Sequence, residues 1–144
     1  MRLLLTAFIC LFFATFLSAQ PKQIVHQTFL VDDHEKIEVQ LYEDDYQLVF
    51  WAGNTILTET NITLENGFKH LLAYHVDSLS RYEIVDETLE TTLLLTSFDN
   101  RRAVIAIKYK GDELYPNELV TTRVYIPDVF VKESEHVFVR KEKN

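Results

Sequence analysis

The sequence contains very little cysteine: Cys10 is the only one among 144 residues. Cys10 lies in an apolar run close to the first residue, and no cysteine follows it. The remainder of the chain therefore cannot form a disulfide within itself, and it has neither a thiolate metal site nor a cysteine nucleophile.

Glycine is also scarce, since only Gly53, Gly67 and Gly111 are present. Their spacing excludes the glycine-rich loops with which P-loop and dinucleotide-binding proteins hold phosphate groups. No serine lies in a G-x-S-x-G elbow, the local signature of a hydrolase nucleophile. We therefore expect no catalytic residues and no cofactor, and a protein that is not an enzyme.

Basic side chains are too few for a polyanionic partner. The chain has 14 Lys and Arg against 22 Asp and Glu, which gives a formal net charge of −8. Its only basic clusters, Arg101-Arg102 and Arg140-Lys141, have acidic residues nearby. Nucleic-acid binding depends on clustered Lys and Arg, and so does attraction to anionic membranes. We expect no nucleic-acid partner.

The apolar run is too short for a stable membrane span. It extends over residues 3–17 after the positive Arg2, whereas a spanning helix needs about 20 apolar residues. Small residues, Ser18 and Ala19, follow it, which is the order of parts in a secretory signal. We predict a signal peptide over residues 1–19, cleaved after Ala19, and no membrane span after cleavage. Cys10 lies too far inside the run to be the lipidated cysteine of a lipoprotein.

The predicted signal gives the protein an expected location. Removing residues 1–19 also removes the only cysteine and leaves a charge of −9, because Arg2 is the only charged residue among them. Exported domains without disulfides are typical of bacterial envelopes, whereas small eukaryotic secreted domains are usually rich in disulfides. We expect an exported protein in the periplasm or on the cell surface of a bacterium.

Residues 20–144 read as one strand-rich domain. Apolar and polar residues alternate from Ile37 to Leu41, the period-two pattern of a half-buried strand. Further apolar or β-branched runs predict strands, and acidic or glycine-containing turns such as 43–45 and 52–54 separate the first of them. These runs cover residues 46–51, 55–63, 82–85, 91–97, 103–109, 119–126 and 136–140.

One segment, residues 65–80, has helical rather than strand periodicity. Apolar residues recur there at spacings of three and four, which places Phe68, Leu71, Leu72, His75, Val76 and Leu79 on one stripe. Asn66 or Thr63 could cap the start of this helix. About eight short strands with one amphipathic helix predict a mainly β fold, either a short β-solenoid, a roll or a sandwich.

The clusters of potential metal ligands have simpler interpretations. Residues 32–35, Asp-Asp-His-Glu, lie between two strand patterns, where a solvated turn favours acidic residues and no metal spacing rule is met. His70 and His75 are five residues apart on the predicted helix, so they point in different directions. We expect no metal site. Tyr42, Tyr46 and Trp51 are the candidates for a sugar- or peptide-binding surface, although core packing is the other role of such residues.

The run from Lys22 to Ile84, followed by Thr122 to Pro127, resembles the first unit of the adhesin-type β-solenoid families, uncharacterised envelope proteins common in Bacteroidetes-type bacteria. The shared pattern is a strand that ends in tryptophan, a small polar turn and a β-branched strand, here residues 48–57. These families continue into Gly- and Asn-rich coils that this sequence lacks. The resemblance implies an adhesin-like role and no catalytic residue.

A single solenoid unit leaves one end of its sheet open, because solenoids bury their core by stacking units. The resemblance therefore implies that the final strand, a partner or another copy of the chain covers this end. The leading hypothesis is an exported, non-enzymatic envelope domain that binds or scaffolds an envelope protein or glycan. The alternative is a periplasmic carrier of a small apolar ligand or lipid held between helix and sheet. A hydrolase, the third hypothesis, needs a polar cleft.

Overall fold

The computed structural model of the chain describes residues 20–42 and 46–142. The predicted signal peptide with its cleavage after Ala19 lies outside the described residues, and so does the predicted acidic turn at 43–45. The eleven strands of the described residues therefore all belong to the predicted domain, which is mainly β as expected.

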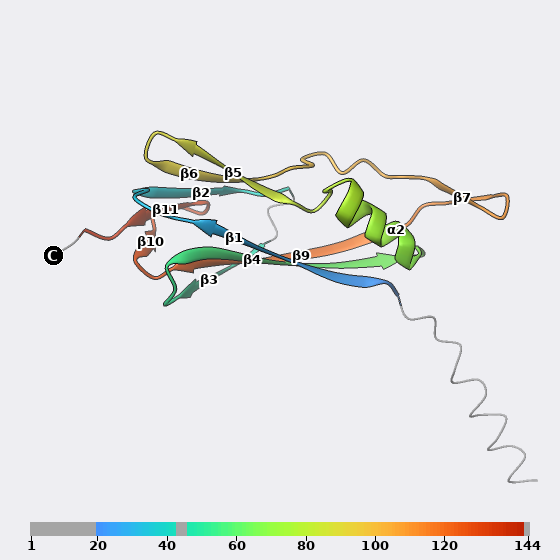
Figure 1. Cartoon of the computed structure of the whole chain (residues 1–144), viewed down its shortest axis with the longest axis horizontal. Coiled ribbons are helices and arrows are strands. Elements are labelled where there is room, and N and C mark those ends of the chain that lie inside the picture. Colours follow the sequence, from blue (N-terminus) through green and yellow to red (C-terminus); the bar gives the residue numbers. More distant parts are fainter. Residues whose placement is uncertain (1–19, 43–45, 143–144) are drawn as a thin grey trace, which may run out of the picture.

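Two sheets face each other as separate layers, which identifies the fold as a sandwich among the three predicted arrangements (Figure 1). The first sheet has the order β1 (Lys22–Leu30), β4 (Thr55–Glu65), β9 (Asn117–Pro127) and β3 (Tyr46–Trp51). Its pairs are antiparallel except β3 and β9, which are parallel. The second has the order β10 (Phe130–Lys132), β11 (Val137–Arg140), β2 (Lys36–Gln40), β6 (Thr92–Ser97) and β5 (Ile84–Leu89).

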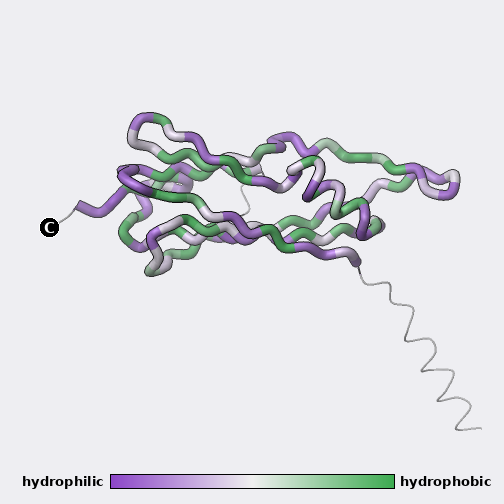
Figure 2. Tube along the Cα trace, viewed as in Figure 1, coloured by the Kyte–Doolittle hydropathy of each residue, from purple (hydrophilic) through white to green (hydrophobic). Residues whose placement is uncertain are grey.

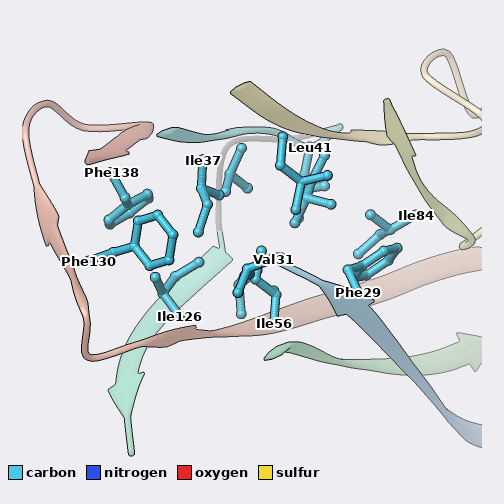
Figure 3. Close-up of a cluster of buried hydrophobic side chains, with 13 residues drawn as sticks. Phe29, Val31, Ile37, Leu41, Ile56, Ile84, Ile126, Phe130 and Phe138 are labelled. Atoms are coloured by element: carbon cyan, nitrogen blue, oxygen red, sulfur yellow. The ribbon is translucent and has the colours of Figure 1, made fainter. Parts of the chain in front are cut away.

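Period-two alternation places one face of each layer in the interior. In β4 and β6 every second residue is buried, which is the pattern that a pleated strand with one covered face produces. Apolar segments accordingly follow the strands of both layers, with hydrophilic turns between them (Figure 2). Thirteen buried apolar side chains from both sheets, among them Phe29, Ile37, Ile126, Phe130 and Phe138, meet between the layers (Figure 3). We call this part of the molecule the sandwich end.

Beyond the sandwich end, β4 and β9 continue without the second sheet above them. A helix, α2 (Lys69–Ala73), and a π-helical turn, η2 (Tyr74–Ser78), cover their inner face instead (Figure 1). The predicted stripe is correct for Leu71, Leu72 and His75, which are buried, whereas Leu79 is exposed. A second cluster forms here from Ile62, Leu64, Leu71, Leu72 and Tyr82. We call this part the helix-covered end.

The helix is shorter than the predicted range 65–80. Glu65 still belongs to β4, and Asn66 adopts a left-handed conformation with φ 55° that turns the chain. At Gly67 an added Cβ would lie 2.3 Å from the Leu64 side chain, so the tight turn needs glycine there. Phe68 is the N-cap residue and makes no side-chain cap hydrogen bond, which corrects the expected capping by Asn66 or Thr63.

The predicted strand over residues 103–109 is mostly wrong. Only Ile107–Tyr109 forms a strand, β7, and it pairs with β8 (Asp112–Leu114) in a separate hairpin that turns at Lys110-Gly111. Residues 103–106, Ala-Val-Ile-Ala, take no strand conformation although their sequence is apolar. The sequence interpretation gave no range for the strand before residue 32, which is β1, and it did not identify β8 and β10. It placed the start of β5 two residues too early and its end four residues too early.

Candidate functional site

Arg81 is a buried cation at the helix-covered end, with 5% of its side chain exposed. It follows η2 after a turn at Ser80, where φ is 48°, and its backbone N–H donates to the carbonyl oxygen of His75 at 3.0 Å. The guanidinium reaches Glu118, an inner-face residue of β9. Nε donates to Oε1 at 3.0 Å and to Oε2 at 3.1 Å, and Nη2 lies 2.9 Å from Oε1. Such fork-like pairs are the strongest ion-pair geometry available to arginine.

The other donors of Arg81 hold the irregular segment 98–106. Nη1 donates to Oδ2 of Asp99 at 3.1 Å, and Nη2 donates to the carbonyl oxygen of Ala103 at 2.9 Å. The second carboxylate oxygen of Asp99 accepts the backbone N–H groups of Arg101 and Arg102. Side chains thus bind backbone groups of Arg101, Arg102 and Ala103, which in a sheet would bind a neighbouring strand.

Tyr82 completes the group that we call the Arg81 network: Arg81, Tyr82, Asp99 and Glu118. The Tyr82 hydroxyl donates to Oε2 of Glu118 at 2.9 Å. Burial raises the pKa of Tyr82, and the Glu118 carboxylate raises it further. Burial alone would raise the pKa of Asp99, but the N–H groups of Arg102 and Arg101 and the charge of Arg81 lower it. The network therefore holds a neutral tyrosine and an ionised aspartate.

His75 lies beside this network and is 1% exposed. Neither of its ring nitrogens has a hydrogen-bond partner within the described residues, and Nδ1 is 3.9 Å from Oε1 of Glu118. Burial lowers its pKa, Glu118 opposes this, and Arg81 adds to the lowering. A buried imidazole beside a guanidinium favours the neutral form, because protonation would place a second cation there.

A hollow of about 200 Å³ adjoins the Arg81 network. Arg81, Glu118, Tyr42 and Arg102 line it together with Val104 and Val120. The guanidinium of Arg102 lies over the rings of both Tyr42 and Tyr82, 4.9 and 5.3 Å from the ring centres, as in cation–π contacts. The hollow is smaller than the 300–1,000 Å³ that is typical of sites for drug-sized ligands.

The three aromatic candidates from the sequence do not form one surface. Tyr42 and Tyr46 both line a space of about 40 Å³ between the sheets, where the Tyr46 hydroxyl donates to the carbonyl oxygen of Val39. Trp51 belongs to the outer face of the first sheet. Its indole N–H donates to the carbonyl oxygen of Thr55, and its ring lies so close to Gly53 that an added Cβ would come within 2.1 Å.

The acidic turn after β1 is held by an arginine. Nε of Arg140 donates to the carbonyl oxygen of His34 at 2.8 Å, and Nη2 donates to that of Asp32 at 2.7 Å. The His34 ring bonds the carbonyl oxygen of Val31 and the Thr88 hydroxyl. Within residues 20–42 and 46–142, no three His, Cys, Asp or Glu side chains come together as a metal site would require.

The outer edge of β3 is a second candidate site. Its neighbour on one side is β9, and within the described part of the chain no strand pairs with its other side. The carbonyl oxygen of Trp51 accepts the N–H of Asp128 on the β9 side. Because successive residues of a strand point their backbone groups to opposite sides, the N–H and C=O of Leu48 and Phe50 point to the open side.

The side chains at this edge are apolar and partly accessible. Val49 is 37% exposed, and Phe50 is 46% exposed with its ring edge-on to Phe138. Sequence reasoning identified the strand itself but could not identify which strands lie at the edges. It also missed the Arg81 network, although extending the period-two pattern of β9 back to Glu118 would have placed a carboxylate on the inner face.

Among the residues that the structure describes, no helix has the length and apolar character needed to cross a membrane. No known protein family matches the chain. No curated protein and no solved structure matches it significantly.

Proposed function

We propose that this domain is an exported, non-enzymatic binding or scaffolding module of the bacterial cell envelope, with an adhesin-like role. Its binding surface is the open edge of β3 and the adjoining outer face with Val49 and Trp51. The observation that carries this proposal is the contrast between two sites. The polar groups of the Arg81 network bind one another, whereas the backbone groups of Leu48 and Phe50 point out of the sheet.

The Arg81 network supports a structural rather than a catalytic role. Its cation has a carboxylate on each side, and the Tyr82 hydroxyl is engaged by Glu118. A general acid or base has to reach substrate with a group whose pKa lies near the working pH. The pKa of Tyr82 is raised and that of Asp99 is lowered, so both are shifted away from neutral pH.

The packing at the helix-covered end supports a binding surface more than a carrier. The predicted carrier holds its ligand between the helix and the sheet, and Leu64, Leu71 and Leu72 of the second cluster occupy that space. An unpaired strand edge, by contrast, offers main-chain hydrogen bonds to an extended segment of a partner.

In-cell photo-crosslinking tests the proposed surface. A photoreactive amino acid at Val49 should attach the protein to another envelope macromolecule, a protein or a glycan. The matched control is Leu89, which is 47% exposed on β5, an edge strand of the other sheet. Equal yields at the two positions would contradict the proposed surface.

Two measurements on protein from its source test the remaining parts. Native mass spectrometry should give the mass of the bare chain, whereas a bound small apolar molecule would support the carrier. Sequencing of the amino terminus should begin at Gln20. Recovery of the chain with Met1 intact would contradict export through a cleaved signal.

A further inference from the structure

We propose that β3 pairs with β3 of a second copy of the chain, antiparallel and centred on Val49, so that two four-stranded sheets become one continuous sheet. This inference rests on the proposed function, because it names a second copy of the chain as the molecule that binds the open edge of β3. It makes the scaffold a symmetric dimer.

The edge strands differ in how they are protected against such pairing. Natural sheets protect their edges with charged side chains, with proline or by keeping the strand short. In the described residues β1 begins with Lys22, β5 carries Asp86 and Glu87, and β10 has three residues ending in Lys132. β3 has six residues, YQLVFW, with neither a charge nor a proline.

The backbone of β3 is complementary to itself. In an antiparallel pair centred on Val49, Leu48 of each copy faces Phe50 of the other. These residues have their N–H and C=O groups on the open side, so each pair exchanges two hydrogen bonds. A two-fold axis repeats the contact, which closes the assembly as a dimer. Val49 then lies opposite Val49 on the outer face.

Charge favours a second copy at this edge and disfavours contact elsewhere. Two chains of formal net charge −8 repel each other over most of their surface, and a close contact is least unfavourable where neither copy carries charge. β3 provides such a strip, and its outer-facing residues Gln47, Val49 and Trp51 are uncharged as well. An acidic or basic peptide partner would find no opposite charge on this strand.

A single cysteine tests the pairing and its register. The chain from Gln20 contains every described strand and both hydrophobic clusters, and it has no cysteine of its own. Residues facing each other without mutual hydrogen bonds have Cα atoms about 4.5 Å apart, which is within the disulfide range of 4.4–6.8 Å. Val49→Cys should therefore form a disulfide-linked dimer under mild oxidation.

Two controls make the result specific. Gln47→Cys lies on the same strand, but in this register the two copies of residue 47 are about 13 Å apart, beyond disulfide reach. Ile24→Cys places the cysteine on the outer face of the edge strand β1, where Ile24 is 53% exposed. Both should stay monomeric under the same conditions, and a dimer of either in equal yield would overturn the proposal.

Charge reversal of the contact gives a second measurement. Val49→Lys places like charges directly opposite each other and should raise the dimer dissociation constant roughly tenfold or more in sedimentation experiments. Ile24→Lys is the matched control and should leave the constant unchanged. A wild-type chain that stays monomeric at about 1 mM would overturn the proposal.

The outcomes separate the dimer from the proposed function. Crosslinks from Val49 to other envelope molecules, with no disulfide in Val49→Cys, would overturn the dimer and leave the proposed function standing. A disulfide-linked dimer with no crosslink from Val49 to anything but this chain would support the dimer and overturn binding of an envelope partner.

Discussion

Strands β4 and β9 run through both ends of the molecule, and a different structure covers their inner face at each end. At the sandwich end, the inner faces of β4 and β9 meet a second sheet through apolar side chains such as Ile56, Val124 and Ile126. At the helix-covered end, the same strands meet a short helix and the Arg81 network. Continuous strands thus pass from an apolar environment into one that contains buried charge.

This difference implies two kinds of stability. Burying an apolar side chain contributes about 1.5–3 kcal/mol and needs no directional partner. A buried ion pair contributes little net stability, but breaking it leaves an unpaired charge at a cost of several kcal/mol. The sandwich end should therefore set the overall free energy of unfolding, whereas the helix-covered end depends on a few exact partners.

The largest expected effect comes from a cavity at the sandwich end. Phe138 is fully buried beside Phe130, and Phe138→Ala should lower the free energy of unfolding by about 3–5 kcal/mol. Urea denaturation measures this change. Val131→Ala, at a residue 40% exposed on the neighbouring strand β10, should change it by less than about 0.5 kcal/mol. Similar values for the two variants would contradict the assignment of the core to this end.

The next effect concerns the buried ion pair. Glu118→Leu leaves Arg81 without its main carboxylate and should cost about 3 kcal/mol, since Asp99 and Ala103 still hold part of the guanidinium. Arg81→Met combined with Glu118→Leu should be more stable than Glu118→Leu alone, because no unpaired charge remains. A double-mutant cycle by urea denaturation measures the coupling.

Hydrogen exchange then shows where Glu118→Leu acts. Amide exchange should become faster in α2, η2 and the segment 98–106, whereas β2 and β6 at the sandwich end should keep most of their protection. Equal loss of protection in both regions would mean that the two ends do not differ as proposed.

The sequence predicted the sandwich end better than the helix-covered end, for a physical reason. Strands with apolar inner faces, such as β2 and β6, follow the period-two rule that makes them recognisable. The bounds of β1 were not recognisable, because its inner face carries Gln23 and Gln27 among the apolar residues. The sequence does not show which group a glutamine on an inner face bonds, so such a glutamine looks like an interruption of the apolar pattern.

The candidate site could be predicted only in part. Tyr42 and Tyr46 do line one common space, but Trp51 lies elsewhere. Arg81 and Glu118 are 37 residues apart in the sequence, and their pairing depends on the turn after η2 and on the register of β9. No local pattern contains that information. A charged residue within a predicted strand indicates only that some partner exists.

A smaller, pH-dependent effect belongs to His75. Its folded-state pKa lies below the ordinary value of 6.5, so the unfolded chain takes up the proton first as the pH falls. Stability from this group is therefore fully present above about pH 6.5 and is lost as the pH falls towards the folded-state pKa. The slope is at most about 1.4 kcal/mol per pH unit for one proton.

The His75→Leu variant isolates this contribution. Urea denaturation of both proteins between pH 7 and about pH 5 should give a wild-type stability that falls more steeply with acid than that of the variant. Parallel curves would show that His75 binds its proton equally well in the folded and unfolded chains, and that the helix-covered end has no sensitivity to acid from this residue.

The smallest expected effect lies between the two ends, where β1 meets the other sheet. The Gln27 side chain donates from Nε2 to the carbonyl oxygen of Ile84 at 2.8 Å and accepts the Ile84 N–H at 2.9 Å, as a neighbouring strand would. Gln27→Met should cost about 1–2 kcal/mol and speed amide exchange at Ile84. Gln23→Met, on the same face of β1, should change stability by less than about 0.5 kcal/mol. If both variants behave alike, the bond to Ile84 does not join the sheets, and their contact depends on the apolar side chains alone.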